Sequence, residues 1–234
     1  MNKLLQSALV TALLLGAGAA QAQLSAGHIM LTGSAGYSSD KNGVGDRTAT
    51  FTAGTISPQV GYFIVENLAI GLGISYDGIT EKTKRKSLAG TGTVSYERTT
   101  TTMSYGPFVR YYKPVGERAA FFGQLGAGFG SSKVSQKNEG TDYPQQPAPT
   151  AIKDQKYSLL GASLTPGFTF FPTDHFGLEI SMGGLSYSRE KLKDKPEGTD
   201  VPDTWEDDNT ITSLEASFGL RNLLIGATWY LGGK

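Results

Sequence analysis

Large apolar residues recur at every second position through most of this sequence. The stretch NLAIGLGISYDG (67–78) shows the pattern most clearly, with five such residues on one parity: Leu68, Ile70, Leu72, Ile74 and Tyr76. Alanine, glycine, serine and aspartate fill the other parity. Because successive side chains of a β-strand point to opposite faces, this stretch predicts a strand with one apolar face and one nearly bare face.

Eight segments share this pattern, and their connections are alternately short and long. The segments are 27–38, 50–64, 67–78, 101–112, 119–132, 156–171, 176–188 and 212–231. The short connections are 65–67, 113–118 and 172–175, and the long polar ones are 39–49, 78–99, 133–155 and 189–210. An even strand count with short turns on one side and long loops on the other is typical of outer-membrane barrels. We therefore predict an all-β fold: an eight-stranded antiparallel up-and-down transmembrane β-barrel with both termini on the short-turn, periplasmic side.

The N-terminal sequence MNKLLQSALVTALLLGAGAAQAQ has the features of an export signal. Basic Lys3 precedes an apolar stretch, and small residues at Ala20 and Ala22 fit the A-x-A cleavage rule. We therefore expect a cleaved signal peptide at 1–22 and a barrel domain at 23–234, the alternative being an uncleaved membrane helix. Beyond residue 22, no run of 18 apolar residues predicts a spanning helix.

Composition narrows the function classes. The 234 residues include no cysteine, which excludes disulfides and thiolate metal sites. The formal net charge is zero, so nothing indicates a nucleic-acid partner.

Two irregularities interrupt the strand pattern. Pro58, Pro107 and Pro166 fall inside predicted strands, where proline cannot donate to the ladder, so we expect local bulges there. In the last segment the apolar parity changes between Leu220 and Leu223. A one-residue slip at 221–222 accounts for this change, whereas a tight hairpin there would give nine strands.

Polar residues within the strands indicate which face is wet. Gln59, Arg110, Gln124 and Glu179 all lie on the parity opposite to the large apolar residues. A basic residue on the lipid face near the midplane costs about 2–4 kcal/mol, so these four should point into the lumen and form an interior polar network. That network is interpreted as a structural plug, with a gated proton or ion path as the alternative. The side chains predicted to face lipid are Leu68, Ile70, Leu72, Ile74, Tyr76, Leu223, Ile225 and Trp229.

Aromatic residues gather at the short-turn ends of the predicted strands. A girdle at the membrane interface would explain their common level. The set is Tyr62, Phe63, Tyr111, Tyr112, Phe170, Phe171, Phe176, Trp229 and Tyr230.

The residues provide little for catalysis or metal binding. Both histidines, His28 and His175, fall at the periplasmic end, away from any outer-surface site, so we predict no enzymatic activity, no cofactor and no metal. The acidic run 203–208 lacks the regular spacing of a calcium loop and is interpreted as solvated charge. A basic run is expected to contact lipopolysaccharide phosphates, with a plain solvated loop as the alternative: Lys82, Lys84, Arg85 and Lys86.

Three stretches resemble the small outer-membrane β-barrel proteins of the OmpX, OmpA-barrel and OmpW-like kind. They are GHIMLTGSAGYSS (27–39), GYFIVENLAIGLGISY (61–76) and NLLIGATWYL (222–231). The resemblance implies a Gram-negative outer-membrane location, contact with outer-membrane lipid and insertion by the barrel-assembly machinery. The family usually ends on an aromatic residue, whereas this chain continues past Tyr230 with LGGK.

Two functions remain for such a barrel. The first is a monomeric structural or surface-interaction protein, with a largely filled lumen and four extracellular loops that contact an extracellular partner or lipopolysaccharide. The second is a narrow porin-like channel or a conduit for small apolar molecules. A soluble lipocalin-like barrel is the rival at the level of fold.

Overall fold

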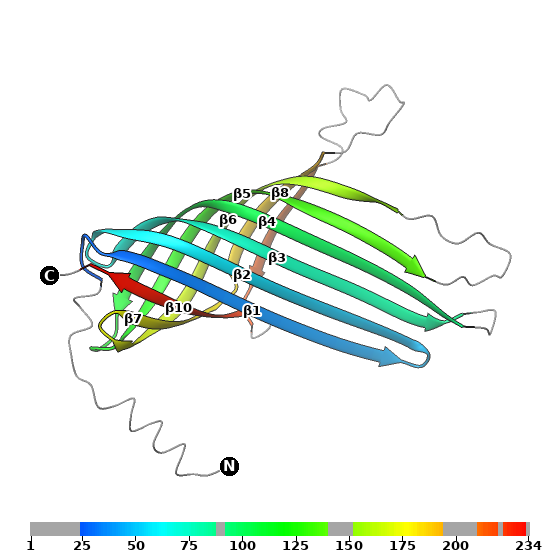
Figure 1. Cartoon of the computed structure of the whole chain (residues 1–234), viewed down its shortest axis with the longest axis horizontal. Helices are drawn as coiled ribbons and strands as arrows, with labels where there is room; N and C mark the ends of the chain where they lie inside the picture. Colours follow the sequence, from blue (N-terminus) through cyan, green and yellow to red (C-terminus); the bar gives the residue numbers. More distant parts are fainter. Residues whose placement is uncertain (1–23, 88–91, 140–151, 194–209, 220–221, 233–234) are drawn as a thin grey trace, which may run out of the picture.

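The computed structural model describes residues 24–87, 92–139, 152–193, 210–219 and 222–232 (Figure 1). They form ten antiparallel strands: β1 (Ile29–Val44), β2 (Arg47–Val65), β3 (Leu68–Lys86), β4 (Thr93–Pro114), β5 (Ala119–Glu139), β6 (Ile152–Thr173), β7 (Phe176–Met182), β8 (Gly184–Leu192), β9 (Thr210–Ser217) and β10 (Leu223–Leu231). Within these ranges no helix is long and apolar enough to cross a membrane. The all-β prediction is confirmed, and the predicted signal peptide lies outside the described residues.

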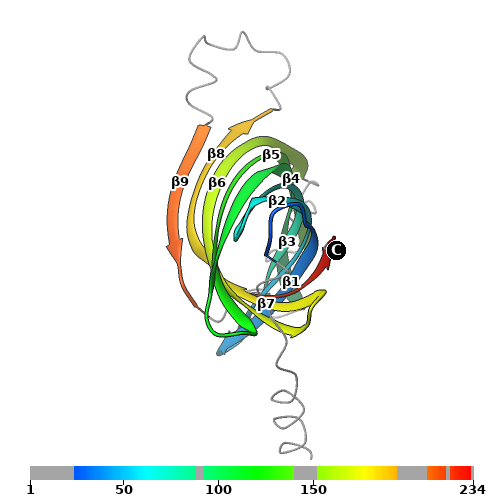
Figure 2. The same ribbon diagram turned by 90° about the vertical axis from the view of Figure 1, so that its left-hand side faces the viewer.

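The sheet is rolled up, and at the short-turn end its ladder returns to the starting strand (Figures 1 and 2). Pairing runs in order from β1 through β2, β3, β4, β5 and β6 to β7. β7 pairs with β10, and β10 pairs with β1 across Ile29–Ala35. At this end each of these strands therefore has two neighbours.

The seventh and eighth predicted segments are each divided in two. β7 and β8 are separated by Gly183 and both pair with β6, while β10 and β9 pair with β7 and β8 respectively. Met182 pairs with Leu223, and Gly184 pairs with Ser217. Between these two pairs the β7–β8 side has one residue and the β9–β10 side has five, so the β9–β10 side has four extra residues. The predicted one-residue slip at 221–222 is therefore wrong, because four additional residues separate β9 from β10. Residues 220–221 themselves lie outside the described ranges.

The prolines interrupt hydrogen bonding without shifting the register of their own strands. The β2–β3 ladder skips Pro58 and the β4–β5 ladder skips Pro107, yet the same register resumes beyond each gap. Near Pro166 the register between β6 and its partners does shift by one residue, but the extra residue is Gly183, between β7 and β8, and not a residue of β6. The expectation of bulges at Pro58 and Pro107 was wrong, because losing one donor opens a ladder locally but does not require an extra residue. Register shifts within the ladders lie instead near strand ends, at Phe63/Val65, Val134/Gln136 and Phe170/Thr173.

Several connections that the sequence predicts to be long loops are largely strand. Between β1 and β2 only Gly45 and Asp46 intervene, and β3 and β4 extend to Lys86 and from Thr93. These extensions are rich in threonine, whose branched side chain suits a pleated strand even where both faces are wet. Among the short turns, Asn67 adopts a left-handed backbone (φ 63°), a conformation that asparagine tolerates.

Candidate functional site

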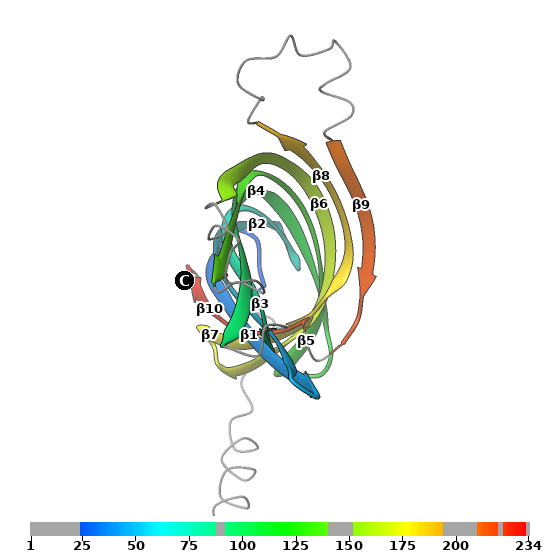
Figure 3. The same ribbon diagram turned by 90° about the vertical axis from the view of Figure 1, so that its right-hand side faces the viewer.

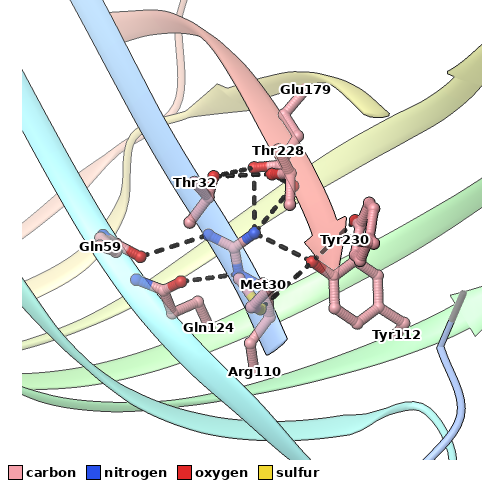
Figure 4. Close-up of polar contacts among 9 residues, drawn as sticks. All are labelled: Met30, Thr32, Gln59, Arg110, Tyr112, Gln124, Glu179, Thr228 and Tyr230. Atoms are coloured by element: carbon pink, nitrogen blue, oxygen red, sulfur yellow. Dashed lines mark hydrogen bonds and ion pairs between the residues drawn. The ribbon is translucent and has the colours of Figure 1, made fainter. Parts of the chain in front are cut away.

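A buried ion pair crosses the interior of the rolled sheet near its short-turn end (Figure 4). Arg110 extends from β4 and Glu179 from β7, and Arg110 Nη1 lies 2.9 Å from each Glu179 carboxylate oxygen. Both residues are 4% exposed. Arg110 Nε donates to Gln124 Oε1 at 2.7 Å, and Nη2 donates to Gln59 Oε1 at 3.4 Å. The structure thus brings together all four residues predicted for the interior network.

Hydroxyl groups complete the hydrogen bonding of this pair. Thr228 of β10 donates to Glu179 Oε1 at 2.5 Å, and Thr32 of β1 donates to Oε2 at 3.3 Å. Arg110 Nη1 also donates to Tyr112 Oη at 3.0 Å. A buried ion pair is tolerated when additional hydrogen bonds satisfy its remaining donors and acceptors. Side chains from strands on opposite sides of the interior therefore hydrogen-bond to one ion pair, whose net charge is zero.

Aromatic rings pack against this network on both sides. The Arg110 guanidinium lies 4.4 Å from the ring centroid of Phe122. Toward the short-turn end, Phe63, Tyr112, Phe171 and Tyr230 are at most 2% exposed, and their neighbouring ring centroids are 5.8–6.2 Å apart. Leu24 and Met30 belong to the same buried cluster. We call the ion pair with this cluster the plug.

The plug corrects the interpretation of the aromatic residues as a single girdle. Four of the nine point inward: Phe63, Tyr112, Phe171 and Tyr230. Their sequence neighbours Tyr62, Tyr111 and Trp229 point outward and are exposed. The common level of the rings is as predicted, but strand alternation divides them between an inner cluster and an outer row.

Above the plug the interior is hollow. A chamber of about 290 Å³ lies over Arg110 and Glu179 and is lined by small polar side chains that include Ser34, Ser104 and Ser163. A second cavity, which we call the vestibule, measures about 650 Å³ and shares Ser57, Ser75 and Leu224 with that chamber. The interior is therefore filled at the short-turn end and open above it, in contrast to the largely filled lumen that the sequence led us to expect.

The wall of the vestibule is open along one line, which we call the seam. Among the described residues, β1 beyond Ala35 pairs only with β2, and β9 pairs only with β8. Figures 2 and 3 show β9 standing apart from β1 across this opening. The vestibule is bordered by Tyr37 and Ser38 on one side of the seam and by Glu215 and Ser217 on the other.

The outer face carries most of the residues predicted to face lipid. Six of the eight are 43–63% exposed: Ile70, Leu72, Ile74, Tyr76, Ile225 and Trp229. Leu68 and Leu223, which begin β3 and β10, are half-buried. We call this exposed zone the apolar band.

The basic run expected to meet lipopolysaccharide does not form one surface. All four residues lie on β3 rather than in a loop, and Arg85 falls on the parity opposite to Lys82, Lys84 and Lys86. Lys82 Nζ lies 2.7 Å from Glu97 Oε2, and Lys86 Nζ lies 2.8 Å from Asp46 Oδ1. Part of the positive charge on this strand is therefore already countered by carboxylates.

The other residues considered for catalysis or metal binding do not form one site in the described parts of the chain. His28 lies near the start of β1, where its Nδ1 is 3.0 Å from Ser25 O, and His175 lies in the β6–β7 turn, so both are at the short-turn end. In the described parts of the chain, no group of three or more His, Cys, Asp or Glu side chains is placed to hold a metal ion. The acidic run 203–208 lies outside the described residues.

Sequence reasoning missed the hydroxyl groups of the plug. Thr32, Thr228, Tyr112 and Tyr230 fall on the inward parity of their strands, at the same end as Arg110 and Glu179. Their parity and level were readable from the sequence. The hydrogen bonds from Thr32 and Thr228 to Glu179 were not, because they depend on the register that joins β10 to β1.

Comparisons with known proteins identify the family. Residues 8–221 match the family described as the outer membrane protein beta-barrel domain. The chain belongs to this family. Members of the outer membrane β-barrel family reside in the outer membrane of Gram-negative bacteria, so that location applies to this chain. No curated protein sequence matches the chain.

Solved structures with a similar fold are outer-membrane proteins of low sequence identity. The outer membrane protein OprG from Pseudomonas aeruginosa is 13% identical, with a TM-score of 0.40 over 91% of this chain and 99% of that chain. Ail, the attachment invasion locus protein of Yersinia pestis, is 16% identical, with a TM-score of 0.31 over 88% of this chain and 99% of that chain. At this identity the likeness concerns the fold alone.

Proposed function

We propose that this chain is a monomeric eight-stranded barrel, exported with a cleaved signal peptide and inserted by the barrel-assembly machinery, with short turns and both termini in the periplasm. In this arrangement β7 with β8, and β9 with β10, each act as one interrupted strand. The apolar band contacts outer-membrane lipid, and the polar strand extensions project from the cell surface. Its role is non-enzymatic: a structural and surface-interaction protein whose outer connections meet an extracellular partner.

The plug is the observation that carries this proposal. A through-channel needs a continuous wet path, but here Arg110 and Glu179 are joined at 2.9 Å and the aromatic cluster beneath them is at most 2% exposed. Burying a mobile ion among these rings would be unfavourable, because an unpaired charge loses its hydration there. The lumen is therefore closed to ions at the periplasmic end.

Conductance in planar bilayers tests this proposal. Purified protein that shows a heat-modifiable gel shift, and is therefore folded, should give no stable single-channel steps. The paired variant Arg110→Ala/Glu179→Ala should give none either, because the aromatic cluster beneath the ion pair still closes the lumen. Stable conductance from the unaltered protein would overturn the closed-lumen role. Absence of the gel shift, with a monodisperse protein in detergent-free buffer, would favour the lipocalin-like rival.

A second candidate, a conduit for small apolar molecules, is favoured by the seam. The vestibule of about 650 Å³ lies next to an unpaired stretch of wall, so a molecule could leave it sideways into lipid without passing the plug. Leu224 lines this cavity and Ile225 points outward beside it. Leu224→Trp should therefore weaken binding of an apolar fluorescent probe to folded protein, whereas Ile225→Trp should not. Equal binding by both variants would remove the conduit from consideration.

A further inference from the structure

The chamber above the plug is lined by hydroxyl groups that have no partner in the described part of the protein. Five of its side chains make no hydrogen bond to any described residue: Ser34, Ser104, Ser163, Thr165 and Ser181. Ser181 is 8% exposed, so its hydroxyl is withdrawn from bulk solvent and lines the chamber. A buried polar group without a hydrogen bond is unfavourable. These hydroxyls therefore need partners inside the chamber, either water or a polar ligand.

The ion pair and its two amides add directed donors at the chamber floor. Among the described lining residues, the charged ones are Arg110 and Glu179, whose opposite charges are joined at 2.9 Å. Gln59 and Gln124 each use Oε1 to accept from Arg110, so their amide nitrogens remain available as donors. Figure 4 shows the amide nitrogen of Gln124 turned away from Arg110. The floor thus presents hydrogen-bond donors without presenting a net charge.

The chamber is continuous with the vestibule and closed below by the plug. The two cavities share five lining residues: Ser57, Ser75, Ser163, Thr165 and Leu224. The vestibule carries two carboxylates, Asp77 and Glu215, and its described lining contains no lysine or arginine. An anion entering from the open end would meet these negative charges first. The route to the chamber therefore disfavours anions, and the plug makes the chamber a dead end.

The lining also disfavours an apolar ligand. An apolar molecule would displace water from the hydroxyls and amides without replacing its hydrogen bonds, which loses affinity. A sugar hydroxyl both donates and accepts, so it can reproduce the hydrogen bonds of the displaced water. Phe122 and Leu224 supply apolar surface for the C–H groups of a sugar ring. The chamber volume of about 290 Å³ is near the lower end for ligand pockets, about 300–1,000 Å³, so the ligand should be small.

We propose that the chamber binds an uncharged monosaccharide that enters from the open end through the vestibule. The inference rests on the closed lumen of the proposed function, which makes the chamber a receptor pocket and not a segment of a channel. The hydroxyls of Ser34, Ser104 and Ser181 bind the hydroxyl groups of the sugar. The amide nitrogens of Gln59 and Gln124 donate to its oxygens.

A panel of small ligands tests the chemical class. Folded protein in a polyoxyethylene detergent, which has no sugar headgroup, is titrated with glucose, galactose, mannose and N-acetylglucosamine and followed by saturation-transfer NMR. At least one should bind saturably below about 50 mM. Glucuronate, which adds a negative charge, and cyclohexanol, which keeps one hydroxyl, should bind at least about tenfold more weakly than the best sugar. If no sugar of the panel binds, or if cyclohexanol binds as tightly as the best sugar, the proposal is wrong.

A matched pair of leucine substitutions tests the location. Ser104 lines the chamber, whereas Ser38 lines the vestibule and not the chamber. Ser104→Leu fills part of the chamber and should weaken sugar binding at least about tenfold. Ser38→Leu adds the same side chain near the entrance and should change the affinity less than about threefold. With both variants folded by the heat-modifiable gel shift, equal losses would place the sugar outside the chamber and overturn the proposal.

Removing hydroxyls without adding bulk tests the contacts. Ser34→Ala/Ser181→Ala removes two chamber hydroxyls that no described residue binds, so the protein should stay folded while sugar affinity falls about three- to tenfold. The control Ser38→Ala/Ser186→Ala removes two vestibule hydroxyls and should leave the affinity unchanged. Unchanged affinity in the first variant would contradict the assigned contacts.

Cysteine protection, combined with conductance, separates failure of this inference from failure of the closed lumen. The chain contains no cysteine, so Ser104→Cys gives a single thiol in the chamber. Bound sugar should slow the reaction of this thiol with a small methanethiosulfonate reagent, and should not slow the reaction of Ser38→Cys. Lack of protection in a protein that does not conduct would overturn the site alone. Stable conductance would overturn the closed lumen, and with it the dead-end site, whether or not the sugar binds.

Discussion

The two ends of this rolled sheet differ in how their strands are paired and in how their interiors are filled. At the short-turn end each strand has two neighbours, and the interior holds the plug. At the other end β9 and the upper part of β1 each pair with one neighbouring strand in the described part of the chain, and the interior is a vestibule of about 650 Å³. In hydrocarbon an unpaired strand edge is strongly unfavourable, because water is not there to satisfy its backbone groups. The stability of the molecule should therefore reside in the closed end, while the open end is free to take up ligands.

Among the variants that compare the two ends, the largest loss of unfolding free energy should come from removing the carboxylate of Glu179 in the plug. Glu179→Ala leaves the Arg110 guanidinium buried without a counter-charge, and breaking such a pair typically destabilises by about 3–5 kcal/mol. Urea unfolding in lipid vesicles, followed by the heat-modifiable shift, measures this loss. Arg110→Ala/Glu179→Ala should lose less than the sum of the two single variants, because it strands no charge. Additive losses would mean that the two groups do not act as a pair.

A charge on the outer face should have the next largest effect. Leu72 lies midway along the apolar side of β3 and is 63% exposed. Leu72→Lys should destabilise the inserted protein by about 2–4 kcal/mol, as expected for a lysine at the bilayer midplane. Ser104 lines the chamber above the plug, so Ser104→Lys should lose less than about 1 kcal/mol. If the two variants were equally destabilised, the apolar band would not be facing lipid.

A single added methyl group should distinguish the dense end from the hollow end. A Cβ on Gly167 would lie 2.1 Å from Phe122 Cζ, and that ring stacks on Arg110. Gly167→Ala should therefore cost about 1–3 kcal/mol through overpacking. A Cβ on Gly78, which lines the vestibule, meets no atom within 4 Å. Gly78→Ala should change the unfolding free energy by less than about 0.5 kcal/mol, and a larger loss there would show that the vestibule is not open.

The sequence predicted the closed end better than the open one. Period-2 alternation places Arg110, Glu179, Gln59 and Gln124 on one face, and a common strand level was enough to bring them together. The same alternation predicts that Phe63 points inward and Tyr62 outward. The common position of the aromatic residues along the strands had instead suggested a single girdle.

The seam could not be predicted in the same way. It depends on where the ladder between β10 and β1 stops and on the four additional residues between β9 and β10, neither of which has a periodic signal. The polar ends of β1 to β4 were equally hard to recognise, because strands that are wet on both faces lose the apolar alternation by which strands are detected. Even so, the Thr-rich stretch TTTT (99–102) carried a β-propensity signal that could have extended β4.

The smallest effect should come from the exposed ion pairs of the open end. Lys82 and Glu97 are joined at 2.7 Å, but their side chains are 37% and 28% exposed, so water and salt screen the attraction. Lys82→Gln should reduce the unfolding free energy only slightly, and the loss should vanish in high salt. If the loss of unfolding free energy in Lys82→Gln did not depend on salt, the ion pair would be shielded from water. The closed end would then extend closer to the cell surface.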